Sequence, residues 1–256
     1  MKHSTKVLLL LMVLFSAGCV TEGGLATGPE SDEEAAQAYL ELGIGYLEQD
    51  QPVPAVDALN RALSYQPRMS DAHSVIALAY DQLQEIELAE NHHRRATQLS
   101  PGSPIPQNAF AVFLCRQNRW TEAEPLFRTA IDNARAMDPR NWMFNAATCA
   151  RSSGDPEGEE RYLREVLSFD PVDAAALRGM IDLSIREQDY WQGRGFWQRL
   201  EQTSPVQSVD LLSCYIIESG LGDDTAAGQC ATRLAAEFPE SPAESQLRQL
   251  IAVNGG

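Results

Sequence analysis

Apolar and small residues recur along most of the chain with a period of 34 residues. Pro67 and Pro101 lie 34 residues apart, and the same interval separates Pro171, Pro205 and Pro239. A period of this length is typical of a helix–turn–helix repeat, in which small residues mark the helix contacts and a proline stops the second helix. The pattern therefore predicts stacked helical hairpins rather than a single globular core.

The first repeat, counted from Ala36, fits this pattern at all eight diagnostic positions. Positions 4, 7, 8, 11, 20, 24, 27 and 32 are Tyr39, Leu42, Gly43, Tyr46, Ala55, Leu59, Ala62 and Pro67. In all, six repeats are predicted, near residues 36–69, 70–103, 104–139, 140–173, 174–207 and 208–241. A last helix over 242–254 begins with Ser241 and Pro242 as N-cap and first helical residue, and it reads as a cap.

The fit weakens toward the C-terminus. The third repeat lacks proline at position 32 and runs on to Pro139, which indicates a lengthened second helix or loop. Position 20, which is normally a small residue, is Glu159 in the fourth repeat, whereas the fifth repeat has Gly193 there. The period and the positions resemble the tetratricopeptide repeat, and they predict an all-α fold: a right-handed solenoid of about six repeats plus a C-terminal capping helix.

In such a solenoid the first helices line a concave groove, which typically receives an extended peptide or a partner helix. Positions 2, 5, 9, 12 and 13 of the first helix face that side. In the first repeat they include an apolar stripe, and later repeats continue it. The predicted partner-binding residues are Leu40, Ile44, Leu47, Leu78, Asn108 and Val112. The alternative is that the tether or the curl of the solenoid covers this stripe.

The N-terminus has the pattern of an export signal. Lys2 and Lys6 precede a nine-residue apolar run, and Ser16–Cys19 follows it. The run is too short to span a membrane. Its end resembles the bacterial lipobox, although Ser16 stands where an aliphatic residue is usual. We expect a signal peptide over 1–18, a lipidated Cys19 with a flexible tether over 19–35, and the repeat domain over 36–256.

An ordinary cleaved signal with an incidental cysteine is the alternative to lipidation. The residue after Cys19 is Val20 and not the aspartate that resembles an inner-membrane retention signal. We therefore expect an anchor on the periplasmic face of the outer membrane.

The charge and the motifs exclude several other functions. The formal net charge is −16, which disfavours nucleic-acid binding. No phosphate loop, HExxH or GxSxG motif occurs, so we expect no enzyme, no metal and no cofactor. Of the four histidines, His92 and His93 are adjacent, and His73 and His93 hold repeat positions that favour packing.

Four cysteines remain after Cys19, and an exported chain meets an oxidising compartment. Cys115 and Cys149 fall on first helices of neighbouring repeats, whereas Cys214 and Cys230 fall on the two helices of one hairpin. We predict the pairs Cys115–Cys149 and Cys214–Cys230. Four buried free thiols are the alternative.

The chain resembles the type IV pilus biogenesis/stability lipoprotein family, PilF/PilW. The stretches "AYLELGIGYLEQDQPVPAVDALNRALSYQP", "NAFAVFLCRQNRWTEAEPLFRTAI" and "NAATCARSSGDPEGEERYLREVLSFDP" carry the resemblance. The "FLC" with a later "NAxxC" looks like a cysteine pair of that family, and "NAF" departs from its usual "NYG". The resemblance covers nearly the whole chain.

This resemblance implies a pilotin, an outer-membrane lipoprotein that binds the pilus secretin subunit and promotes its localisation and multimerisation. The lipid on Cys19 would supply the membrane address, and the first repeats would bind the secretin. We expect a monomer. Another periplasmic scaffold, such as an adaptor for cell-wall enzymes, is the alternative function.

Overall fold

The structure, a computed structural model, describes residues 31–134 and 137–254. These residues form thirteen α-helices and no strand. The prediction of an all-α solenoid of helical repeats is confirmed. The signal peptide, Cys19 and most of the predicted tether lie outside the described residues.

The first twelve helices form six consecutive hairpins, and the thirteenth follows alone. The hairpins are α1 and α2 (Asp32–Glu48, Pro52–Tyr65), α3 and α4 (Ser70–Gln82, Ile86–Leu99), α5 and α6 (Pro104–Arg116, Trp120–Asp132), α7 and α8 (Arg140–Ser152, Pro156–Phe169), α9 and α10 (Ala174–Arg186, Tyr190–Thr203), and α11 and α12 (Ser208–Gly220, Asp224–Glu237). Helix α13 spans Pro242–Asn254.

The turn between the two helices of each hairpin contains one residue in the left-handed backbone region. These residues are Asp50, Gln84, Asn118, Gly154, Gln188 and Gly222, with φ between 56° and 73°. A left-handed residue just past a helix end lets the next backbone N–H groups bond the last carbonyls of the helix. The six positions are 34 residues apart, except for 36 between Asn118 and Gly154. The turns thus keep the register of the repeats.

The two extra residues fall in the connection after α6. That helix ends at Asp132, and α7 starts only at Arg140. The sequence left open whether the third repeat has a lengthened second helix or a longer loop, and the structure shows a longer loop. Residues 135–136 of this connection lie outside the described residues.

Helix α1 begins earlier than the sequence pattern suggested. Residues 32–35, assigned to the tether, form its first turn, and the Ser31 hydroxyl accepts a hydrogen bond from the Glu34 backbone N–H at 3.2 Å. Asp32, Glu33 and Glu34 stand at the positive end of the helix dipole, which favours acidic side chains. A capped, acidic first turn explains why the helix extends here.

Small residues allow the two helices of a hairpin to approach closely. A Cβ atom at Gly43 would lie 2.5 Å from Leu59 Cγ, so no larger residue fits without movement of that side chain. The equivalent contact residues Ala55 and Ala62 are fully buried. Apolar side chains from successive repeats join these contacts into two core clusters, one in repeats 1 and 2 and one that runs from Ala89 of repeat 2 to α13.

Glu159, which does not match the small-residue pattern, is buried and paired. Its carboxylate accepts from Arg186 of the next repeat. Arg178 likewise pairs with Asp210 at 2.8 Å, again from one repeat to the next. The C-terminal repeats therefore add ion pairs to the apolar stacking, because a buried carboxylate requires a partner.

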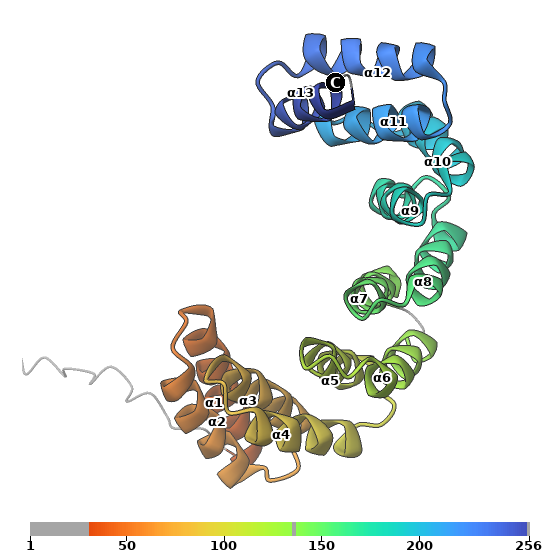
Figure 1. Cartoon of the computed structure of the whole chain (residues 1–256). Helices are drawn as coiled ribbons and strands as arrows, with labels where there is room; N and C mark the ends of the chain where they lie inside the picture. Colours follow the sequence, from red (N-terminus) through yellow and green to blue (C-terminus); the bar gives the residue numbers. More distant parts are fainter. Residues whose placement is uncertain (1–30, 135–136, 255–256) are drawn as a thin grey trace, which may run out of the picture.

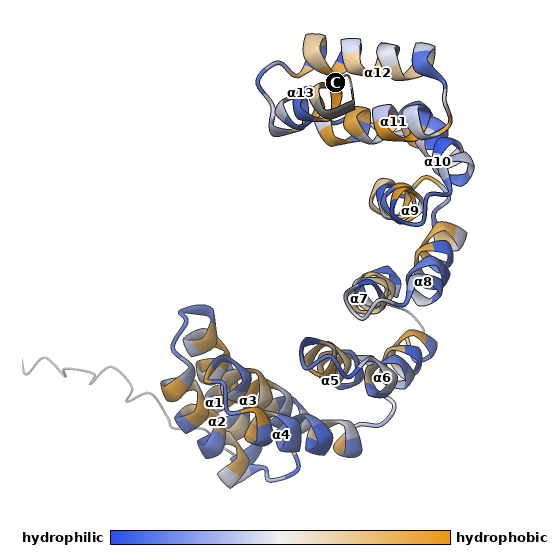
Figure 2. Ribbon diagram, in the orientation of Figure 1, coloured by the Kyte–Doolittle hydropathy of each residue, from blue (hydrophilic) through white to orange (hydrophobic). Residues whose placement is uncertain are grey.

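The hairpins stack into an open arc, with α5, α7 and α9 on its inner side and α6, α8 and α10 outside (Figure 1). Figure 2 shows that individual helices carry both apolar and polar residues, as expected of helices that bury one face. Helix α13 closes the C-terminal end, where Ala243 and Leu247 join the core. The inner side of the arc is where the candidate site lies.

Candidate partner-binding groove

An apolar groove lies on the inner side of the first three repeats. We call it the N-terminal groove. It is formed by α1, α3 and the end of α5, and its apolar residues come from successive turns of α1 and α3. Its lining residues are Ile44, Leu47, Glu48, Val75, Leu78, Asp81, Gln82 and Arg116.

The centre of the groove is apolar and its edge is polar. Ile44 and Leu78 stay exposed although both are large aliphatic side chains, and Leu47 is half-buried. Large exposed apolar residues that line one hollow mark an interaction surface more strongly than isolated ones do. Such a surface suits the apolar side chains of a bound peptide or helix.

Arg116 supplies the only positive charge among the residues that line this groove. Its guanidinium forms an ion pair with the buried Asp81, so it joins the second repeat to the third. The Arg116 side chain remains about half exposed. It can therefore donate further hydrogen bonds to a ligand.

A second hollow continues from Arg116 toward the fourth repeat. Val112, Cys115, Asn145 and Thr148 contribute to its lining. Nearby, the Asn145 amide donates a hydrogen bond to the Asn108 side-chain oxygen at 3.1 Å. The inner side of repeats 1 to 4 thus carries two adjoining hollows, and Arg116 lines both of them.

The predicted partner-binding residues separate into three groups. Ile44, Leu47 and Leu78 line the N-terminal groove, and Val112 lines the second hollow. Asn108 lines neither hollow but bonds to Asn145. The placement of Leu40 in the groove is wrong, because only 4% of Leu40 is exposed. It belongs to the buried cluster of repeats 1 and 2, which we call the N-terminal core and which includes Ala72 and Ile76 of α3.

Five residues that line the groove were absent from the predicted partner-binding set: Glu48, Val75, Asp81, Gln82 and Arg116. Val75 stands at position 6 of its repeat, outside the positions that the repeat pattern assigns to the concave side. Arg116 stands at position 13 of the third repeat, which is one of those positions, so the same register could have found it. The repeat pattern does not predict the ion pair between Arg116 and Asp81.

The cysteines form two disulfides in the structure. Cys115 is joined to Cys149, with their Cα atoms 5.6 Å apart, and Cys214 to Cys230, with Cα atoms 6.0 Å apart. The first bond links α5 to α7, and both of its cysteines line the second hollow. It therefore ties together the two first helices that form this part of the groove.

The three histidines of the described residues pack within and between repeats 2 and 3. His93 is fully buried, with its ring 5.6 Å from that of Phe110 and 5.0 Å from that of Phe113. Burial lowers the pKa of His93 to about 3. His73 Nδ1 lies 3.1 Å from His92 Nδ1, and burial lowers the pKa of His92 to about 4. Neutral rings in a packed interface agree with a structural role.

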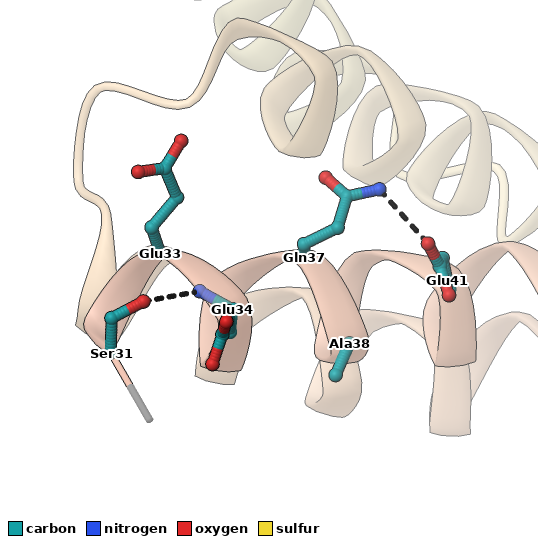
Figure 3. A pocket seen from close by; sticks show the side chains of 6 residues that line it. All are labelled: Ser31, Glu33, Glu34, Gln37, Ala38 and Glu41. Carbon is teal, nitrogen blue, oxygen red and sulfur yellow. Dashed lines mark hydrogen bonds between the residues drawn. The ribbon is translucent and has the colours of Figure 1, made fainter. Parts of the chain in front are cut away.

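A further hollow at the start of α1 offers no comparable surface (Figure 3). It is lined by Ser31, Glu33, Glu34, Gln37, Ala38 and Glu41, all from the first turns of one helix. The Gln37 amide donates to Glu41 at 3.1 Å. A hollow along a single helix, lined by carboxylates, has no apolar centre to bury.

The described part of the chain contains neither a candidate metal site nor a candidate membrane span. No group of three or more His, Cys, Asp or Glu residues there is arranged to hold a metal ion. No helix there is long and apolar enough to cross a bilayer.

Stacked helical hairpins with an exposed groove along their first helices define a repeat scaffold for protein–protein interaction. The sequence profile of the tetratricopeptide repeat matches residues 40–104 and 114–176, half of the chain. The chain belongs to the tetratricopeptide repeat family.

Among known proteins, the chain is homologous to type IV pilus assembly protein PilF of Pseudomonas aeruginosa. The two are 25% identical over 237 residues, which cover 91% of this chain and 94% of PilF. An uncharacterized protein of Haemophilus influenzae is 27% identical over 157 residues, which cover 61% of this chain and 86% of that protein.

The solved structures agree on the fold. The structure of Pseudomonas aeruginosa PilF superposes with a TM-score of 0.64 at 22% identity, over 85% of this chain and 98% of that one. PilW, a widely conserved type IV pilus biogenesis factor, superposes with a TM-score of 0.63 at 23% identity, over 83% of this chain and 97% of that one.

Proposed function

We propose that this chain is a pilotin: an outer-membrane lipoprotein that binds the secretin subunit of the type IV pilus and promotes its localisation and multimerisation. The observation that carries the proposal is the similarity to PilF, which spans 94% of that protein and includes the repeats that form the groove. A relative matched over nearly its whole length shares the repeat stack and not merely one common hairpin.

The N-terminal groove is the proposed secretin-binding surface. Ile44, Leu47, Val75 and Leu78 present apolar side chains to a segment of the partner, and Arg116 and Gln82 present hydrogen-bond donors beside them. Burying exposed apolar side chains supplies affinity, whereas the polar edge fixes the orientation of the segment. The proposal needs no reaction chemistry, so the protein acts as a scaffold and not as an enzyme.

The proposed membrane address is a lipid on Cys19. The apolar run and the small residues before this cysteine support it. Several acyl chains hold a protein on a membrane far more firmly than one chain does. Metabolic labelling with a fatty-acid analogue should mark the wild type and not Cys19→Ala, and labelling of both would reject the anchor.

A complementation experiment tests the function. In a strain that lacks the gene, the wild-type chain should restore secretin multimers and their outer-membrane location, as seen by immunoblotting of membrane fractions. The double variant Ile44→Asp/Leu78→Asp should not restore them, because two carboxylates in the groove oppose apolar burial. Normal multimers without the gene would reject the proposal and would favour another periplasmic scaffold.

A further inference from the structure

The first repeat exposes a position that every later repeat buries. Position 7 of the first helix is Leu42 in repeat 1, and 46% of this side chain is exposed. In repeats 2 to 6 no more than 6% of the residue at this position is exposed: Ile76, Phe110, Ala146, Met180 and Cys214. Leu42 therefore holds a position that belongs to the core in the later repeats, but no described helix buries it.

The cover in the later repeats is the second helix of the preceding repeat. Phe110 of α5, for example, stacks on His93 of α4 with ring centroids 5.6 Å apart. Among the described helices, α1 packs mainly against α2 and α3. At the opposite end of the solenoid α13 covers the last hairpin. The described part of the chain is thus capped at one end.

The open end has a hollow between α1 and α2. We call it the end face. Its residues are Tyr39, Leu42, Tyr46, Pro54, Asp57, Ala58 and Arg61. Arg61 donates a hydrogen bond to the Tyr39 hydroxyl at 3.2 Å, and the Tyr39 ring stacks on Tyr65 at 5.9 Å. These contacts hold the aromatic side chains in place around the apolar centre, so the face is preorganised for a helix.

The end face carries opposite charges one turn apart on α2. Asp57 and Arg61 are both exposed, and the small Ala58, which lies between them, is buried at the floor of the hollow. If two copies of α2 cross antiparallel near Ala58, Asp57 of each copy meets Arg61 of the other. A small residue at the crossing lets the helices approach, and the charges then pair across a two-fold axis.

We propose that the end face is the interface of a two-fold dimer, in which α2 of each copy takes the place of the missing preceding helix of the other. Because α13 caps the opposite end, the contact joins like ends and closes as a dimer instead of growing into a filament. This arrangement differs from the monomer expected from the sequence. It leaves the N-terminal groove, on the inner side of the arc, open in both copies.

Sedimentation velocity of the chain from residue 20 onward tests the proposal, because this chain retains every described helix. The wild type should sediment as a dimer that dissociates on dilution. Leu42→Asp should weaken the dimer by about tenfold or more, since it places a charge at the buried centre. The matched control is Leu88→Asp on α4, where 42% of the leucine is exposed, and it should leave the dimer intact.

A charge exchange separates a second copy from any other occupant. Asp57→Arg and Arg61→Asp should each weaken the dimer, because like charges then face one another. The double variant carries both changes and should restore it, with circular dichroism melting curves confirming that each variant is folded. The proposal would be overturned by a wild type that stays monomeric at all concentrations, or by a double variant that dimerises no better than the single variants. Either result would also be expected if a helix of another protein occupied the end face.

Discussion

At the scale of single residues, Leu40 and Ile44 show how one helical turn changes the role of an aliphatic side chain. They lie on the same stripe of α1, yet 4% of Leu40 is exposed against 37% of Ile44. Leu40 packs in the N-terminal core with residues of α2 and α3, whereas Ile44 lines the groove.

This difference predicts that truncation destabilises the protein more at Leu40 than at Ile44. Leu40→Ala should lower the free energy of unfolding by about 3 kcal/mol, because it removes buried methyl groups and leaves a cavity. Ile44→Ala should lower it by about 1 kcal/mol or less, because much of the side chain is already in water. Urea denaturation of both variants measures the two values. Equal losses would show that Leu40 is not a core residue.

The buried His93 predicts a dependence of stability on pH. Its pKa in the folded protein is about 3, mainly because of burial and with Arg116 adding to the shift, and the usual value is 6.5. The unfolded chain therefore binds a proton more readily than the folded one between these values. The stability is fully present above about pH 6.5 and is lost progressively as the pH falls toward 3.

Between pH 7 and pH 5 this single group should remove about 2 kcal/mol of stability. The variant His93→Leu places an apolar side chain at this position that cannot titrate. Its free energy of unfolding should therefore fall by about 2 kcal/mol less than that of the wild type over the same interval. Denaturation of both proteins at the two pH values gives the comparison. The other titrating groups are shared, and parallel pH profiles would contradict the prediction.

At the scale of elements, one carboxylate ties two hairpins together. Asp155 caps α8, because its side chain accepts a hydrogen bond from the Gly158 backbone N–H at 2.9 Å. Its other oxygen accepts from the Trp120 indole of α6, also at 2.9 Å. The cap of one repeat is therefore also a contact to the repeat before it.

Asp155→Ala should cost about 2–3 kcal/mol of unfolding free energy, because it removes a helix cap and leaves the half-buried indole N–H without its partner. Asp189→Ala is the matched control. Asp189 caps α10 by accepting from the Gln192 backbone N–H at 3.1 Å, so its loss should cost about 1 kcal/mol. Similar losses for the two variants, measured by denaturant unfolding, would show that the indole contact adds nothing.

At the scale of the whole molecule, the repeat register could be predicted from the sequence because each repeat carries its own helix-ending and helix-contact residues. Prolines, small contact residues and the turn residues recur at fixed intervals, and helices α3, α5, α7, α9 and α11 begin at the residues from which the repeats were counted. Local chemistry of this kind needs no knowledge of neighbouring repeats.

Features that depend on contact between repeats could not be read in the same way. Leu40 holds a position assigned to the groove, but it is buried in a core cluster with residues of α2 and α3. Glu159 breaks the small-residue pattern and is accommodated by Arg186, which lies 27 residues away. Two residues that line the groove, Arg116 and Asp81, form an ion pair from one repeat to the next. Each case is decided by how one hairpin sits on the next.

The central claim is that the N-terminal groove binds the secretin subunit, and direct titration tests it. The chain from residue 20 onward is titrated with the purified periplasmic part of the secretin subunit in a calorimeter. We predict saturable binding, a loss of affinity of about tenfold or more for Ile44→Asp/Leu78→Asp, and wild-type affinity for the exposed control Leu88→Asp. Absence of binding by the wild type, or equal affinity for the groove variant and the control, would contradict the account.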